Sequence, residues 1–346
     1  MAGNPETGNT GPSQDVTTGM TGESIELSKS VSNVQGVDMM TKKIGFIGLG
    51  HMGRPMANTL IAQGFVLNVY NRTPEKAAAL VTKGAGLVDR PSQAVEPGGV
   101  AITMLSDDAA LESVVSGDPD FVERLRPDGI HLSMSSISPA LARRLADHHR
   151  KRQVRYVAAP VFGRPEAAEA RKLWICVSGE REPKERVAPV LNSLGQGVFD
   201  FGEDPGASNV VKLIGNFLLA SAMEALAEGF ALGEKEGIDR VAVAELFTKT
   251  LFNSPAYRIY SELIAYRKFE PAGFRVSLGL KDIRLVLDTA KMANMPMPLA
   301  NLLRDRLLAT LDKGWGNLDW SGIALDVAAE AGLATAPFQA RPHADL

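Results

Sequence analysis

The pair of residues best suited to acid–base chemistry is Lys212 and Asn216, four residues apart in a mostly apolar stretch. In a helix this spacing places both side chains on one face, and Asn209 joins the same stripe. A lysine among apolar neighbours either extends its ammonium to an interface or is held for chemistry. Burial lowers the pKa of a lysine, which suits a proton donor near neutral pH, and Asn216 could orient a substrate or the lysine. The spacing alone leaves both interpretations open.

A glycine-rich turn near residue 50 is the second feature that could do chemistry. Residues 43–47 read as a short apolar strand, and Gly48, Gly50 and Gly53 follow it before a predicted helix. These glycines permit a tight turn, close approach of backbone to a pyrophosphate and packing of helix on strand. The N-terminus of the helix adds free N–H groups and partial positive charge. The pattern predicts a dinucleotide site with these contact residues: Gly48, Leu49, Gly50, His51, Met52 and Gly53.

The residues after the second predicted strand, at 66–70, indicate which dinucleotide binds. An NAD site usually places Asp or Glu there to accept a hydrogen bond from the ribose 2′-hydroxyl. This chain has Asn71, Arg72 and Thr73 instead. No carboxylate would repel a 2′-phosphate, and the planar guanidinium could clamp one. Arg72 could also be a solvated loop cation, but the glycine turn upstream favours an NADP(H) site.

Short apolar runs alternate with helical segments from residue 42 to residue 204. The further apolar runs lie at 99–105, 129–134, 156–161 and 174–178, and helical spacing is found at 74–83 and 139–152. This alternation predicts an α/β fold with a Rossmann-type doubly wound sheet and right-handed crossovers. Met104 and Leu105 follow one of these strands, where their backbone would face the cofactor.

The chain changes character after residue 204 and becomes helical. One long apolar helix is predicted at 208–236, and shorter helices follow at 241–250, 254–266, 279–293 and 298–311. We therefore expect three parts: a flexible tail at 1–41, an NADP-binding domain at 42–204 and an all-helical dimerisation and substrate domain at 205–346, joined by the long helix. Polar residues such as Glu224 argue against a membrane span. A helix so apolar must be buried, and a homodimer would cover it.

Composition narrows the function classes. The 346 residues are 45% hydrophobic with a formal net charge of −3 and no basic stripe, so nucleic acid is not an expected partner. The one cysteine, Cys176, lies in an apolar run, which indicates a buried strand residue and a reducing, cytoplasmic setting. No zinc-type cluster of cysteines or histidines is present, so no metal is expected. His148 and His149 are interpreted as a solvated helix face.

Several ordered segments together resemble the β-hydroxyacid dehydrogenase family, the relatives of 6-phosphogluconate and 3-hydroxyisobutyrate dehydrogenases. Residues 45–53 are similar to its nucleotide signature, and 133–139 resemble its D-x-S-T segment. Residues 159–163 resemble its A-P-V-S-G-G loop. Residues 206–216 resemble its G-x-G-x-x-x-K-x-x-x-N helix, with Ser208 in place of the second glycine, and residues 280–283 resemble its L-K-D element. The resemblance covers residues 43 to about 335.

The resemblance implies roles at the matching positions. Lys212 would protonate the carbonyl oxygen as hydride arrives from the nicotinamide, and would act as base in the reverse direction. Asn216 would help to hold the substrate oxygen, and Ser135 would bind the polar end of the substrate. Lys281 would lie beside the cofactor, and Asp282 would orient it or cap its helix. An exposed charged turn is the alternative for this last pair.

Departures from the family pattern bear on the substrate. Ser133 stands where the family has Asp. In the family, the small residues of the A-P-V-S-G-G loop expose backbone N–H groups to a substrate carboxylate. This chain has the bulky Phe162 in that loop, followed by Gly163 and Arg164. The anion pocket is therefore expected to be reshaped or apolar. Arg164 could replace the lost carboxylate binding or lie in solvent. A small hydroxy acid is not the expected natural substrate.

The sequence thus predicts an NADPH-dependent oxidoreductase that acts on a carbonyl or hydroxyl group of a small molecule of the β-hydroxyacid or aldehyde type. Imine reductases belong to the same superfamily but typically carry Asp or Tyr where this chain keeps Lys212, so imine reduction is the alternative. A non-catalytic NADPH-binding module is a third possibility, against which Lys212 and Asn216 speak. The identity of the substrate, the physiological direction and the stereochemistry are not specified by these residues.

Overall fold

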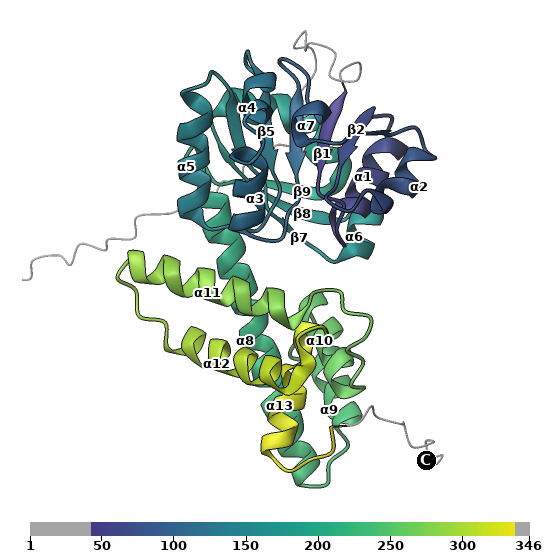
Figure 1. The fold of residues 1–346 in the computed structure, drawn as a ribbon. Coiled ribbons are helices and arrows are strands. Elements are labelled where there is room, and N and C mark those ends of the chain that lie inside the picture. Colours follow the sequence, from purple (N-terminus) through teal and green to yellow (C-terminus); the bar gives the residue numbers. More distant parts are fainter. Residues whose placement is uncertain (1–42, 336–346) are drawn as a thin grey trace, which may run out of the picture. The chain divides into compact units, whose positions relative to one another are not determined.

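The computed structural model describes residues 43–335, so the predicted tail at 1–41 lies outside the described residues. All described residues fall within one compact unit. A sheet occupies the first part of the described chain and helices the second, as the sequence predicts (Figure 1). The domain boundary at residue 204 stays a prediction.

The first part of the described chain forms a nine-stranded sheet, and the first apolar run is its strand β1. Its strands are β1 (Ile44–Ile47), β2 (Leu67–Tyr70), β3 (Gly86–Leu87), β4 (Val100–Thr103), β5 (Ile130–Ser133), β6 (Arg155–Ala158), β7 (Val161–Phe162), β8 (Leu173–Gly179) and β9 (Gly195–Asp200). Strands β3-β2-β1-β4-β5-β6 are parallel, β8 pairs antiparallel with β6 and β7, and β9 runs parallel to β8. The order reverses at β1, between β2 and β4, where such sheets bind ligands.

Helices cover both faces of this sheet. They are α1 (Gly53–Ala62), η1 (Pro74–Ala77), α2 (Ala78–Val81), η2 (Pro91–Ala94), α3 (Asp108–Val115), α4 (Asp120–Leu125), α5 (Pro139–Arg150), α6 (Pro165–Glu169) and α7 (Arg181–Leu194). Successive residues of β1 point to opposite faces: Phe46 packs with Met56 in one core cluster, and Ile47 packs with Leu111 in another. The doubly wound prediction is therefore confirmed.

Two local features differ from the prediction. The apolar run at 156–161 forms two strands, β6 and β7, because Pro160 has no N–H to donate to a ladder. Helix α7 and strand β9 were not predicted. The apolar residues of α7, such as Val187 and Leu191, lie among charged residues and two prolines, which weakens the helical pattern.

The second part of the described chain is helical. It consists of α8 (Ala207–Lys235), α9 (Arg240–Lys249), α10 (Pro255–Ala265), α11 (Val276–Met292), α12 (Pro298–Thr310), η3 (Leu311–Trp315), η4 (Trp320–Gly322) and α13 (Ile323–Glu330). Its core gathers around Phe230, Ile283 and Trp320. Among the described residues, α8 alone has the length and composition of a membrane span, a test that buried core helices also pass, and 44% of its apolar window is buried here.

Candidate active site

The glycine turn after β1 has the geometry that a dinucleotide needs. Gly48 has a φ of +100°, and a Cβ there would lie 2.4 Å from the carbonyl oxygen of Met104. A Cβ on Gly53, at the start of α1, would lie 1.9 Å from the carbonyl oxygen of Gly48. A Cβ on the exposed Gly50 would meet nothing within 4 Å, so the turn is open there. These positions fit a pyrophosphate lying against the turn and the N-terminus of α1.

Asn71 holds this turn against the end of β2. Its Oδ1 accepts a hydrogen bond from the N–H of Leu49 at 2.8 Å, and its Nδ2 donates to the carbonyl oxygen of Thr73 at 2.8 Å. The side chain of Arg72 is exposed beside it. Asn71 therefore shapes the glycine turn, and the exposed Arg72 places a cation beside it.

The remaining predicted cofactor residues flank this turn. His51 is exposed, and Met52 packs partly against the core. The N–H of Met104 donates to the carbonyl oxygen of Ile47 at 2.9 Å, which joins the ends of β4 and β1. Leu105, the next residue, is partly buried. The predicted cofactor residues therefore lie at the carboxyl ends of β1, β2 and β4, except Lys281, which lies on α11.

Lys212 lies in a buried chain of hydrogen bonds. Its Nζ donates to Asn216 Oδ1 at 2.9 Å, and Asn216 Nδ2 donates to Asp282 Oδ2 at 2.5 Å. Asp282 is fully buried, and its Oδ1 lies 2.7 Å from Lys281 Nζ. That ammonium also donates to the carbonyl oxygen of Ser136 at 2.7 Å. The chain therefore connects α8 and α11 with the loop that follows β5, at the carboxyl ends of the parallel strands.

Burial sets the protonation of Lys212. The side chain is 8% exposed, and loss of solvation lowers its pKa to about 8, although the negative charge of Asp282 opposes this shift. An ammonium with such a pKa is mostly protonated at neutral pH and still releases its proton readily. Asn216 can both accept from Lys212 and donate to Asp282, because its amide carries an acceptor and donors. The arrangement can deliver a proton to an oxygen placed beside Nζ.

Phe162 lies beside Lys212, and Arg164 follows Phe162 two residues later. The Nζ atom of Lys212 lies 4.0 Å from the centroid of the Phe162 ring. The exposed Gly163 separates this ring from Arg164, whose Nη1 lies 3.1 Å from Asp319 Oδ2. Asp319 is buried, and its carboxylate also accepts from the N–H of Gly273. Of the two alternatives for Arg164, a position in open solvent is wrong, because the buried carboxylate of Asp319 neutralises its guanidinium.

Ser135 is fully buried. Its Oγ accepts a hydrogen bond from the N–H of Leu105 at 2.8 Å and lies 3.4 Å from the carbonyl oxygen of Thr103, to which it donates. The hydroxyl therefore ties the end of β4 to the loop after β5. A substrate contact of Ser135 stays a prediction.

The interpretation of His149 as part of a solvated face is wrong. The side chain is fully buried, its Nε2 lies 2.9 Å from Nδ1 of His131, and its Nδ1 lies 2.6 Å from the carbonyl oxygen of Leu145. His131 continues to Thr103 Oγ1 at 2.9 Å, whereas His148 is partly exposed. The signal was the i, i+4 spacing of Leu145 and His149, which places both on the apolar face of α5. No group of three metal-ligating side chains occurs among residues 43–335.

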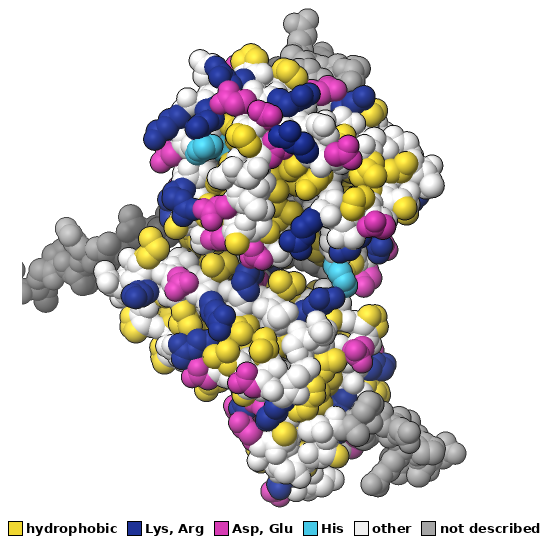
Figure 2. Space-filling view, viewed as in Figure 1, with side chains coloured by type: hydrophobic (Ala, Val, Ile, Leu, Met, Phe, Trp, Pro, Cys, Tyr) yellow, Lys and Arg dark blue, Asp and Glu magenta, His cyan; other side chains and the backbone are white. Residues whose placement is uncertain are grey.

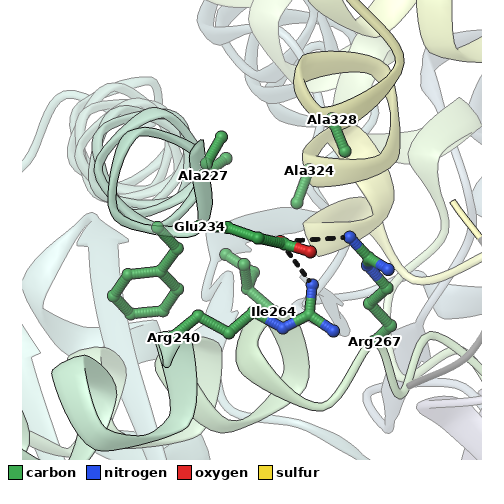
Figure 3. Close-up of a pocket in the computed structure, with 9 residues that line it drawn as sticks. Ala227, Glu234, Arg240, Ile264, Arg267, Ala324 and Ala328 are labelled. Atoms are coloured by element: carbon green, nitrogen blue, oxygen red, sulfur yellow. Dashed lines mark hydrogen bonds and ion pairs between the residues drawn. The ribbon is translucent and has the colours of Figure 1, made fainter. Parts of the chain in front are cut away.

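A small cavity in the helical part is separate from these residues. It measures about 20 Å³ and is lined by side chains that include Glu234, Arg240 and Arg267. Glu234 Oε2 lies 3.0 Å from Arg240 and 3.3 Å from Arg267, and Figure 3 shows both guanidinium groups turned toward it. The volume suits about one water molecule, so this cavity is no site for a dinucleotide.

Comparison with known proteins agrees with this geometry. Residues 43–203 match the family model described as the NAD binding domain of 6-phosphogluconate dehydrogenase. Residues 206–335 match the model described as NAD-binding of NADP-dependent 3-hydroxyisobutyrate dehydrogenase. The chain belongs to the β-hydroxyacid dehydrogenase family. Members of this family are oxidoreductases that use a nicotinamide cofactor, and this chain is one of them.

Individual relatives support the assignment. The chain is 43% identical to the uncharacterised oxidoreductase YfjR of Bacillus subtilis over 81% of this chain and 98% of that protein. It is 33% identical to the 3-hydroxyisobutyrate dehydrogenase of Pseudomonas aeruginosa over 81% and 96%. The structure of Mycobacterium tuberculosis 3-hydroxyisobutyrate dehydrogenase with L-serine is similar, with a TM-score of 0.74 and 27% identity over 82% and 98%. An imine reductase from Pseudomonas sp. shares the fold, with a TM-score of 0.55 and 24% identity over 84% and 99%.

Proposed function

We propose that this protein is an NADPH-dependent reductase of a carbonyl compound, or the corresponding dehydrogenase in the reverse direction, with Lys212 as the general acid and base. The observation that carries the proposal is the buried chain from Lys212 through Asn216 to Asp282, which holds an ammonium with a pKa of about 8 beside the ends of the parallel strands. A nicotinamide cofactor held at the turn of Gly48, Gly50 and Gly53 would supply the hydride for the carbonyl carbon. Lys212 gives its proton to the carbonyl oxygen, so an alcohol results.

The residues hydrogen-bonded in series with Lys212 position the proton that it donates. Asn216 is oriented by Asp282, because the carboxylate can only accept and so requires the amide NH₂ on its side. This orientation turns the amide oxygen toward Lys212 and leaves further ammonium protons for a substrate oxygen. Lys281 partly balances the charge of Asp282 and connects α11 to the loop after β5. Preorganised groups of this kind lower the barrier because they need no rearrangement during proton transfer.

Preference for NADPH over NADH is part of the proposal. The exposed guanidinium of Arg72 and the absence of a carboxylate at 71–73 support it. Relatives differ in this respect: one, 31% identical over 81% of this chain, is the NAD-dependent L-serine dehydrogenase of Pseudomonas aeruginosa. Arg72→Ala should therefore raise the KM for NADPH by about 10-fold or more and leave that for NADH within about 2-fold. Equal effects on both cofactors would contradict the assignment.

A homodimer that takes a small-molecule substrate is also proposed. Ile214 and Leu218 lie one turn apart on α8 and are 51% and 59% exposed, which a second copy would cover. On the face in Figure 2, acidic and basic side chains are interspersed, so this face has no continuous basic surface for nucleic acid. Sedimentation velocity should give twice the mass of the chain, and Leu218→Glu should shift the protein toward monomer. A cytoplasmic location stays a prediction.

The decisive experiment replaces Lys212 with methionine, which has similar length and no charge. We expect kcat/KM for aldehyde reduction to fall about 10²- to 10⁴-fold while the Kd for NADPH stays within about 2-fold. Lys235→Met, at the exposed end of the same helix, is the matched control and should retain full activity. Turnover of Lys212→Met within a few-fold of the parent would overturn the assigned role. A preformed cyclic imine, assayed in parallel, would reveal an imine reductase by a strong preference for that substrate.

A further inference from the structure

The surroundings of the Lys212 ammonium are apolar on the side of Phe162. The ring centroid lies 4.0 Å from Nζ, so the face of the ring covers part of the ammonium. An aromatic face carries partial negative charge, which attracts a cation and disfavours an anion. A carboxylate placed against this ring would lose solvation and gain no donor from it. The ring therefore separates two kinds of substrate: those that bring an apolar group to this side of Nζ, and those that bring a carboxylate.

Gly215 provides the space that the ring occupies. A Cβ at Gly215 would lie 2.3 Å from Cζ of Phe162 and 2.4 Å from its Cε1, closer than any Cβ contact can be. Gly215 lies three residues after Lys212 on α8, so the ring packs against the same helical face that carries the ammonium. Ring and glycine fit as a pair, which holds the apolar wall in place rather than leaving it as a mobile loop side chain.

Three polar side chains nearby that could bind a substrate carboxylate already have partners, whereas the amide of the buried Asn209 has none and Lys212 keeps ammonium protons for a substrate oxygen. The guanidinium of Arg164 is paired with the buried carboxylate of Asp319. The ammonium of Lys281 contacts Asp282 and the carbonyl oxygen of Ser136. The hydroxyl of Ser135 is fully buried, accepts a hydrogen bond from the N–H of Leu105 and donates to the carbonyl oxygen of Thr103. A carboxylate bound by any of these three side chains would have to break an existing interaction.

We propose that Phe162, seated on Gly215, determines substrate specificity by excluding carbonyl compounds that carry a carboxylate and admitting uncharged ones. This inference rests on the proposed function, because it names the substrate class of that reductase. It assigns the enzyme to uncharged aldehydes and ketones, whose alkyl or aryl groups lie against the ring while the carbonyl oxygen reaches Lys212. Phe162 acts in discrimination and takes no part in proton transfer.

The test compares two aldehydes that differ mainly in charge, 4-oxobutanoate and pentanal, at saturating NADPH. The parent enzyme should show a kcat/KM for pentanal at least about 10-fold higher. Phe162→Ser should raise kcat/KM for 4-oxobutanoate about 10-fold and lower that for pentanal, whereas Phe162→Leu, which keeps an apolar wall, should preserve the preference. Unchanged melting temperatures would show that the variants fold.

A second variant displaces the ring without changing it. Gly215→Ala forces the Phe162 ring to move and should shift the ratio of the two kcat/KM values toward 4-oxobutanoate. Gly229→Ala, on the same helix but with nothing within 4 Å of the added Cβ, controls for the higher helix propensity of alanine and should leave the ratio unchanged.

The outcomes separate this inference from the proposed function. A parent enzyme that prefers 4-oxobutanoate, or a ratio that neither Phe162→Ser nor Gly215→Ala changes, would overturn the role of Phe162. In either case the loss of turnover in Lys212→Met would leave the proposed function standing. If the parent enzyme binds NADPH yet reduces neither aldehyde nor any member of a wider carbonyl panel, the proposed function itself fails, and this inference fails with it.

Discussion

Two buried groups of basic side chains lie in this molecule, and burial lowers the pKa of members of both. One contains Lys212, whose pKa falls to about 8. The other contains His131, whose pKa is lowered by burial and then by His149, and His149 itself, whose pKa burial lowers to about 3. A lowered pKa therefore marks burial in both places and by itself identifies neither as a site of chemistry.

The partners of the two groups differ. Lys212 is connected through Asn216 to a buried carboxylate, so its charged form is stabilised within the protein. The histidine chain ends in neutral groups, the hydroxyl of Thr103 and the carbonyl oxygen of Leu145. Because that carbonyl only accepts, each hydrogen bond of the chain has a direction that suits two neutral imidazoles.

The aromatic neighbours of the histidines complete the contrast. The ring of His131 lies 5.3 Å from those of both Phe121 and Tyr156, edge to face. Both histidines are 0% exposed, whereas Lys212 retains 8% exposure and is connected through Asn216 to the charged pair of Asp282 and Lys281. The histidines thus stabilise the fold only in their neutral form, whereas Lys212 has surroundings that allow both its protonated and its neutral form. The predictions below test this division, beginning with the largest effect.

Acid should unfold the protein through the histidine pair. Both histidines have folded pKa values below the ordinary value of about 6.5, so the unfolded chain binds more protons below that pH. Their contribution to stability is complete above about pH 6.5 and is lost as the pH falls toward 3. The free energy of unfolding should fall by up to about 1.4 kcal/mol per pH unit for each histidine, measured by urea denaturation between pH 7.5 and 4.5.

A variant isolates this effect. His149→Gln lowers stability at pH 7.5, because the buried packing changes, but should flatten the dependence of the free energy of unfolding on pH. His148→Gln, at the neighbouring partly exposed position, should retain a slope close to that of the parent. Neither substitution should alter the pH dependence of kcat/KM. If His149→Gln moved that profile, the division between a structural and a catalytic group would be wrong.

Removing the Asp282 carboxylate should have the next largest effect, on the pH dependence of kcat/KM. Asp282 raises the pKa of Lys212 against the effect of burial, so Asp282→Asn should lower that pKa below about 8. Carbonyl reduction needs protonated Lys212, and kcat/KM should therefore begin to fall at a lower pH than in the parent. At pH 8 the loss should be about 10-fold, measured with excess NADPH across pH 6 to 9.5. A profile that keeps its inflection would show that Asp282 does not set the protonation of Lys212.

The contrast also shows what sequence patterns can predict here. The glycine turn and the pairing of Lys212 with Asn216 were predictable because their causes are local: a positive φ at Gly48 and the i, i+4 geometry of one helix. The family and the doubly wound sheet could both be predicted from such local motifs and their alternation. Contacts such as Arg164 with Asp319 depend on segments 155 residues apart, and no local pattern reports which carboxylate an arginine will meet.

The histidines show a different reason for failure. Leu145 and His149 have helical spacing, but the pattern alone does not tell whether a polar residue at the border of an apolar stripe is buried. Burial was decided by His131 on β5, which provides a hydrogen-bonding partner from another element. Phe162 was expected to reshape the pocket, yet its fit to Gly215 required the distance between a strand residue and a helix.

The smallest effect should come from Lys281, and its direction is the sharper test. The positive charge of Lys281 makes the least of the contributions to the pKa of Lys212 and lowers it. Lys281→Gln should therefore raise that pKa slightly and extend activity toward higher pH, opposite to Asp282→Asn. The glutamine amide can still donate to the carbonyl oxygen of Ser136, which limits structural change. General damage to the site would lower activity in both variants without moving the inflection, so opposite shifts in the two pH profiles can arise only if Lys212 responds to both charges.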